Sequence, residues 1–117
     1  MEIRIFEKMD DLNQSFTDWL KEILSEKGHI SVALSGGSTP KSLFDYWVKN
    51  HPTDIPWNRI SFFWGDERCV PPTDEQSNYK MTKEHLFDHV AANPERIFRI
   101  HGENPPEIET KRYTEVL

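Results

Sequence analysis

Cysteine is nearly absent from this sequence: Cys69 is the only one among 117 residues. A single thiol makes no internal disulfide, which excludes a small disulfide-stabilised secreted domain and indicates a reducing compartment. The cytoplasm is therefore the expected location. Arg68 precedes Cys69, but no base stands beside the thiol in the sequence, so a nucleophilic cysteine is only a minor alternative.

Long apolar runs and an excess of positive charge are also missing. No segment approaches the roughly 20 apolar residues of a membrane span, and residues 1–6 lack the basic and apolar regions of a signal peptide. Because 20 Asp and Glu outnumber 14 Lys and Arg, giving a net charge of −6, we expect no nucleic-acid partner and no membrane partner. A phosphorylated substrate is not excluded, since the cations and amides close to a site decide what binds there.

Apolar residues are few, at 36% of the chain with a mean hydropathy of −0.72, but large aromatic residues are plentiful. Four Trp, seven Phe and three Tyr can fill the core of a chain of this length. The sequence has no internal repeat, no low-complexity segment and no linker between two units. We therefore expect one domain over residues 1–117.

The apolar pattern alternates between strand and helix along the chain. We expect strands at residues 3–6, 29–34, 60–64 and 97–100, and helices at residues 10–27, 41–49, 78–90 and from 105 or 106 onward. Such alternation predicts an α/β fold: a three-layer α/β/α, Rossmann-like, mostly parallel sheet with right-handed crossovers.

A Ser-Gly-Gly-Ser-Thr-Pro turn, residues 35–40, follows the second expected strand. Gly36 and Gly37 allow the backbone to approach a ligand closely, and Ser38 and Thr39 add hydroxyls at the positive end of the next helix. Unpaired amides in this position favour a phosphate. The spacing matches neither the Walker A loop nor the dinucleotide fingerprint, so no ATP or NAD cofactor is expected. An ordinary strand-to-helix turn with a Ser/Thr cap is the alternative.

A second polar cluster follows the buried strand expected at residues 60–64. Here Gly65 is followed by Asp66, Glu67 and Arg68. In open α/β sheets ligands bind beyond the carboxyl ends of the strands, which is where both polar clusters are expected. The charges serve either a ligand or a structural ion pair that caps the strand, and we expect the ion pair for Glu67.

Residues 35–40, residues 64–72 and Ser77-Asn78-Tyr79, in this order, closely resemble the motifs of the 6-phosphogluconolactonase family. That family belongs to a wider group with the glucosamine-6-phosphate isomerases, or deaminases, whose acidic motif is usually Asp-Glu-Tyr. Arg68, in place of that Tyr, favours the lactonases. The resemblance covers essentially the whole chain and implies the N-terminal part of a NagB/RpiA/CoA-transferase-like fold.

The lactonases also have a later segment of the type Gly-x-Asp-Gly-His, whose histidine is taken as the general base. None of the five histidines here follows Asp-Gly. We therefore expect this chain to be the N-terminal half of such an enzyme and to be inactive alone. A strand edge and a helix face that the other half would cover should be exposed, and self-association or a domain-swapped dimer is expected.

The resemblance implies hydrolysis of 6-phospho-D-glucono-1,5-lactone to 6-phosphogluconate, the second step of the oxidative pentose phosphate pathway. Water is the nucleophile, and neither a cofactor nor a catalytic metal is implied. The residues implied to bind the phosphorylated sugar lactone are Gly36, Gly37, Ser38, Thr39 and Arg68.

Two residues of the second cluster are implied to be catalytic. Arg68 would bind either the phosphate or the carbonyl oxygen, and Asp66 would orient water, substrate hydroxyls or the histidine. In an isomerase, Asp66 would instead abstract the proton. Ser77, Asn78 and Tyr79 would shape the loop over the pocket, with Asn78 also capping a helix.

Two weaker alternatives concern a metal and a non-catalytic role. His85 and His89 have the i, i+4 spacing of zinc ligands, but the Glu that follows the first His in zinc proteases is absent, so no metal is expected. Besides the isomerase, a non-catalytic sugar-phosphate binding module remains open.

Overall fold

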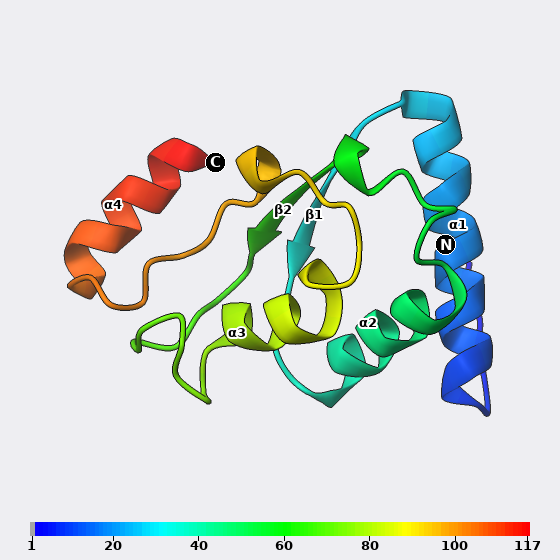
Figure 1. Ribbon diagram of the computed structural model, residues 1–117, viewed down its shortest axis with the longest axis horizontal. Helices are drawn as coiled ribbons and strands as arrows, with labels where there is room; N and C mark the ends of the chain where they lie inside the picture. The colour runs from blue at the N-terminus through cyan, green and yellow to red at the C-terminus, as the bar shows by residue number, and fades with distance from the viewer. Residues whose placement is uncertain (1) are drawn as a thin grey trace.

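The computed structural model describes residues 2–117, with helices packed around a small parallel sheet (Figure 1). In chain order the elements are α1 (Met9–Lys27), β1 (Ile30–Leu34), α2 (Ser38–Asn50), the 3-10 turn η1 (Trp57–Arg59), β2 (Ile60–Trp64), α3 (Asn78–Thr82), the π-helical turn η2 (Lys83–Phe87), the 3-10 turn η3 (Pro94–Arg96) and α4 (Pro106–Val116). No helix among these residues is long and apolar enough to cross a membrane.

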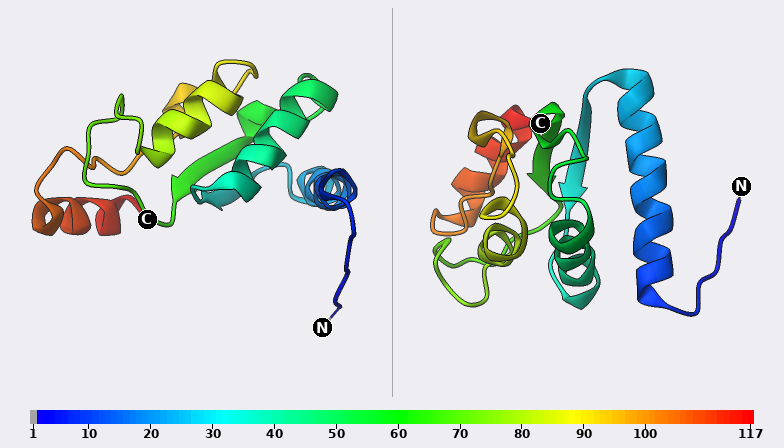
Figure 2. Two further views of the ribbon diagram at one scale, coloured as in Figure 1. Left: turned by 90° about the horizontal axis from the view of Figure 1, so that it is seen from below. Right: turned by 45° about the vertical axis from the view of Figure 1, so that its right-hand side comes forward.

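The sheet consists of β1 and β2, which run parallel and in register from Ile30 opposite Ile60 to Leu34 opposite Trp64. Figure 2 shows α2 and α3 together on one side of the sheet, while α1 flanks β1 and α4 lies beyond β2. The expected α/β class with a parallel sheet is confirmed. The strands expected at 29–34 and 60–64 are confirmed as well, to within one residue.

An aromatic core holds α1 and α2 against the sheet. Trp47 of α2 is 2% exposed and meets Trp57 edge-on, with ring centroids 5.3 Å apart. Its indole N–H donates to the Thr17 hydroxyl over 2.8 Å, and that hydroxyl donates to the Asn13 carbonyl over 2.6 Å. The buried polar groups of α1 are thus satisfied at the contact with α2, as buried groups must be.

The expectation of a strand over residues 97–100 was wrong in its length, because only a bridge between Ile97 and Phe62 forms there. The Phe98 N–H donates to the Phe62 carbonyl over 2.9 Å, and a regular parallel ladder would next join the Trp64 N–H to the Phe98 carbonyl. Instead the Tyr113 hydroxyl enters this gap. It accepts from the Trp64 N–H over 2.9 Å and donates to the Phe98 carbonyl over 2.7 Å, so the two segments separate here.

Two other expectations need correction. Residues 3–6 form no strand, since they find no ladder partner among the described residues, and Ile3 and Ile5 are 75% and 90% exposed. The helix expected over 78–90 is α helix only to Thr82 and then widens into η2, where the Asp88 N–H donates to the Lys83 carbonyl, five residues back.

Replacing Tyr113 by Phe should lower the free energy of unfolding. The change leaves the Trp64 N–H and the Phe98 carbonyl without their partner, and an unsatisfied buried polar group costs about 1–3 kcal/mol. Urea denaturation at pH 7 measures the loss. Tyr79→Phe is the matched control, because the Tyr79 hydroxyl makes no hydrogen bond with the described residues. Equal effects of the two changes would contradict the bridging role.

Candidate functional site

The turn after β1 leaves the start of α2 open. Gly37 has φ 104°, in the left-handed region that favours glycine, and it supplies no side chain to cap α2. Ser38 and Thr39 are exposed in the first turn of this 13-residue helix. Their backbone N–H groups therefore lie at the positive end of α2 without a side-chain cap, an arrangement that attracts an anion.

The second polar cluster begins at the same level of the sheet. Beyond the last pair of the ladder, the Gly65 N–H donates to the Leu34 carbonyl over 3.0 Å. The segment after β2 and the turn after β1 therefore leave the sheet side by side, at its carboxyl edge.

Asn78 joins these two segments. Its side-chain amide, part of a residue only 6% exposed, donates to the Asp66 carbonyl over 3.2 Å, with the Asp66 carboxylate 3.5 Å away. A Cβ placed on Gly36 would lie 2.1 Å from the Asn78 Oδ1 atom. Gly36 is thus needed for the close approach of Asn78, a reason that local sequence patterns do not reveal.

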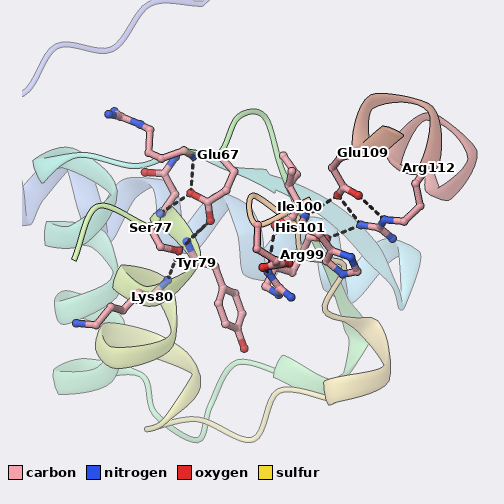
Figure 3. A network of polar contacts seen from close by, with 12 residues as sticks. Glu67, Ser77, Tyr79, Lys80, Arg99, Ile100, His101, Glu109 and Arg112 are labelled. Atoms are coloured by element: carbon pink, nitrogen blue, oxygen red, sulfur yellow. Dashed lines mark hydrogen bonds and ion pairs between the residues drawn. The ribbon is translucent and has the colours of Figure 1, made fainter. Parts of the chain in front are cut away.

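Glu67 does not form the ion pair that we expected. Its carboxylate accepts from the backbone N–H groups of Arg68 (2.8 Å), Asn78 (2.7 Å) and Tyr79 (3.1 Å), and from the Ser77 hydroxyl (2.9 Å). Figure 3 shows this carboxylate turned toward the first residues of α3. The reason is electrostatic: the free amides at the start of a helix are donors that a carboxylate satisfies without any cation.

Ser77, rather than Asn78, caps α3. The Ser77 hydroxyl oxygen accepts from the Lys80 N–H over 3.1 Å, and Asn78 is the first helical residue. The Tyr79 ring packs edge-on against Trp64, with ring centroids 5.6 Å apart. The Arg99 guanidinium lies over the Tyr79 ring, with its carbon 5.7 Å from the ring centroid. The three residues fix the beginning of α3 beside the strand ends.

Asp66 and Arg68 are both exposed. Within the described part of the chain, the Arg68 side chain makes no hydrogen bond or ion pair, while its backbone is fixed on both sides. The Arg68 N–H donates to Glu67 over 2.8 Å, and its carbonyl accepts from the Val70 N–H over 2.8 Å. A rigid backbone therefore presents a free guanidinium near the carboxyl edge of the sheet.

Two residues that the sequence analysis did not select, Gly102 and Glu109, hold the next segment of chain at this edge. A Cβ on Gly102 would lie 2.1 Å from the Arg68 carbonyl oxygen, so glycine alone permits the contact. The Glu109 carboxylate accepts from the Arg112 guanidinium over 2.6 and 2.7 Å and from the His101 N–H over 2.5 Å (Figure 3). A glycine two residues after the end of the strand expected at 97–100 was the available signal for Gly102.

The ion pair with Arg112 lowers the pKa of Glu109 to about 2, although the burial of this carboxyl acts in the opposite direction. Between α4 and the strand ends lies a cavity of about 300 Å³, lined in part by Glu67, Cys69 and His101. Glu109 and Arg112 thus fix α4 as one wall of this cavity.

His85 and His89 do not face a common centre. The His85 ring lies 2.7 Å from the Asp45 carboxylate of α2, and the His89 ring lies 2.8 Å from the Glu84 carbonyl. Residues 2–117 contain no group of three or more His, Cys, Asp or Glu side chains arranged to hold a metal ion. The site therefore consists of free amides, hydroxyls, a carboxylate and a guanidinium, which suit a small polar anion.

The family profile described as glucosamine-6-phosphate isomerases/6-phosphogluconolactonase matches residues 6–117. The chain belongs to this family. It is 46% identical over 86 residues to the 6-phosphogluconolactonase of Treponema pallidum (strain Nichols), a match that covers 74% of this chain. It is 43% identical over 111 residues to the enzyme of that name from Haemophilus influenzae, a match that covers 93% of this chain.

Solved structures agree with the fold. A 6-phosphogluconolactonase from Thermotoga maritima superposes with a TM-score of 0.85 at 28% identity over 97% of this chain. A monomeric glucosamine-6-phosphate deaminase superposes with a TM-score of 0.87 at 22% identity, which shows a shared fold alone. This chain matches 36% of the Treponema relative, 46% of the Haemophilus relative and 51% of the Thermotoga structure, and so spans about half of their length or less.

Gly36→Ala should destabilise the protein, because the new methyl group displaces the Asn78 amide from Asp66. Leaving such buried groups without their hydrogen bonds costs about 1–3 kcal/mol. Gly65→Ala is the control at the other strand end, where the added Cβ would lie an ordinary 3.8 Å from the Leu34 carbonyl. Urea denaturation of both variants checks this, and a Gly36→Ala variant as stable as Gly65→Ala would refute the role of Asn78 in joining the two segments.

Glu109→Gln should destabilise the protein more at neutral pH than in acid. Because the folded pKa of about 2 is below the ordinary value of a glutamate, the ionised form stabilises the fold fully above about pH 4.3 and progressively less as the pH falls toward 2. We expect a loss of about 1–3 kcal/mol at pH 7 that shrinks at pH 3. Urea denaturation at both pH values tests this, with Glu107→Gln, an exposed residue of the same helix, as control. A loss independent of pH would contradict the role of the charge.

Proposed function

We propose that this chain supplies the substrate-binding edge of a 6-phosphogluconolactonase, which hydrolyses 6-phospho-D-glucono-1,5-lactone to 6-phosphogluconate. The observation that carries the proposal is the pairing of an open helix start, at Ser38 and Thr39, with an unpaired guanidinium, that of Arg68, at one edge of the sheet. The close identity to proteins named 6-phosphogluconolactonase supports the choice of reaction.

The binding roles follow from the free groups at the edge. The amides after Gly37 and the hydroxyls of Ser38 and Thr39 donate to the anionic oxygens of the substrate. Arg68 adds a charge-assisted hydrogen bond, either to the phosphate or to the carbonyl oxygen as it gains negative charge. Gly36 contributes indirectly, because its lack of a side chain lets Asn78 hold the two segments together.

The reaction is the addition of water to the carbonyl carbon of a lactone, followed by departure of the ring oxygen. A lactone is an activated ester, so deprotonating the water and stabilising the oxyanion are sufficient, and the atoms balance without a redox cofactor. Asp66 is exposed, and within residues 2–117 its hydrogen bonds come from Asn78; it orients the water or a substrate hydroxyl. The family resemblance assigns the general base to a histidine after Asp-Gly, a sequence that does not occur in these 117 residues.

Arg68 also favours the lactonase over the amino-sugar isomerase, in which the resemblance places Tyr at the corresponding position. The chain then forms part of a single α/β sugar-phosphate domain. A cytoplasmic location agrees with its lone, exposed Cys69.

Binding of 6-phosphogluconate, the product, tests the proposal without requiring turnover. Isothermal titration calorimetry should show binding to the unmodified chain and a loss of at least roughly 10-fold in affinity for Arg68→Ala, since a charged hydrogen bond contributes about 1.5–3 kcal/mol. Arg59→Ala is the matched control, because Arg59 is exposed at the opposite end of β2.

Equal binding by both variants would remove Arg68 from the site. Absence of binding by the unmodified chain would count against the proposed edge. Ammonia release from glucosamine-6-phosphate by an assembled enzyme would identify the isomerase instead. An assembled protein that binds 6-phosphogluconate but turns over neither substrate would identify a sugar-phosphate binding module.

A further inference from the structure

A cavity lies on the side of residues 97–101 that faces away from β2. The Phe98 N–H donates to the Phe62 carbonyl of β2 over 2.9 Å, and the next peptide group, that of Arg99, faces the other way. The cavity on that side has a volume of about 310 Å³. Its lining comes from Tyr79 of α3, from Arg112 and Val116 of α4, and from the segment between residues 94 and 101. We call it the outer pocket.

The Arg112 guanidinium is held in one orientation and still has unused donors. Its Nε and Nη2 atoms donate to the Glu109 carboxylate over 2.6 and 2.7 Å, and Nη2 also donates to the Arg99 carbonyl over 3.0 Å. These three contacts leave the N–H bonds of Nη1, which find no acceptor within residues 2–117. Arg112 therefore presents preorganised donors to the outer pocket.

The other polar residues of the lining also have free donors. Arg99 donates through Nη1 to the Glu103 carboxylate over 2.9 Å, while its Nε and Nη2 atoms have no acceptor among the described residues. The Tyr79 hydroxyl and the His101 ring likewise make no hydrogen bond with that part of the chain. Figure 3 shows the Arg99 side chain between Tyr79 and Arg112. Such a surplus of donors suits an anion.

The remaining lining residues are apolar: Pro94, Ile97, Phe98 and Val116. Phe98 is fixed by stacking on Phe63 of β2, with ring centroids 4.8 Å apart and an angle of 10° between the rings. A small cavity with apolar walls and a few convergent polar groups is typical of a site for a small organic molecule.

We propose that the outer pocket binds a small organic carboxylate whose body is an aromatic or similarly compact apolar group. The carboxylate accepts from Nη1 of Arg112 and from the Arg99 guanidinium, and the body packs against Phe98 and Val116. A single negative charge suits the pocket better than a phosphate dianion, because Glu103 and Glu109 already pair with the two arginines.

The outer pocket is separate from the proposed substrate site. Neither Ser38 nor Thr39 nor Arg68 contributes to its lining. The proposal therefore does not rest on the proposed function, and the two can fail independently.

Benzoate is the probe, titrated into this chain by isothermal titration calorimetry. We expect saturable binding. Benzamide has the same shape without the charge, and acetate has the charge without the ring, so each should bind at least about 10-fold more weakly. Inorganic phosphate should compete at least about 10-fold less well than benzoate does.

Arg112→Lys tests the donors, because lysine keeps a positive charge beside Glu109 but lacks the guanidinium nitrogens. It should weaken benzoate binding at least about 10-fold. Arg96→Lys is the matched control: Arg96 is half-buried and contacts His29, and it does not line the outer pocket.

Val116→Asp tests the location without removing any contact of Arg112. The added carboxylate repels an anion in the pocket, so binding should again weaken at least about 10-fold. Thr114→Asp adds the same charge to the same helix end, on an exposed residue outside the pocket lining, and should leave binding unchanged. Circular dichroism checks that both variants are folded.

Absence of saturable benzoate binding would overturn the proposal, as would benzamide that binds equally well or equal losses in Val116→Asp and Thr114→Asp. Phosphate that binds more tightly than benzoate would assign the pocket to a different anion. Arg68→Ala should leave benzoate binding intact, and its loss in that variant would place benzoate at the substrate site instead. Benzoate binding without 6-phosphogluconate binding would leave the outer pocket standing while the proposed function fails.

Discussion

The carboxylate of Glu67 is the interaction on which the candidate site depends. It satisfies three backbone amides and one hydroxyl at once, and these belong to the segment after β2 and to the start of α3. Without a negative charge at this point, the amides of Asn78 and Tyr79 would lose their acceptor, and Asn78 would no longer be held against Asp66 and Gly36. The Glu67 carboxylate, through Asn78, thus holds the two strand ends in a fixed relative position.

Local chemistry made the turn after β1 predictable. Two glycines after an apolar run and a proline soon afterwards specify a strand, a tight turn and a helix start, whatever the rest of the chain does. Gly37 takes the positive φ that this pattern allows, whereas α2 begins at Ser38, three residues before the start expected at residue 41. The same holds for the end of α1, where Gly28 adopts φ 74° and donates to the Leu24 carbonyl over 2.8 Å.

Contacts between distant segments were not predictable in the same way. Glu67 looked like one half of an ion pair because its neighbours in sequence are charged, whereas its partners are amides about ten residues further along. The segment after Ile97 has the composition of a strand, but Tyr113, from a helix that comes later in the chain, occupies the place of its next ladder bond. Sequence patterns describe what a segment favours, and a distant side chain decides whether it obtains that partner.

The Tyr113 hydroxyl also acts as a spacer of fixed width. A direct ladder hydrogen bond would bring the backbones of Phe98 and Trp64 together. The Tyr113 hydroxyl oxygen, hydrogen-bonded on both sides, holds these two backbones further apart. The cavity beside α4, whose lining includes Tyr113, opens where the segments diverge. Because Trp64 directly precedes Gly65 and Asp66, the position of α4 sets how far the segment after Ile97 diverges from β2 beside the candidate site.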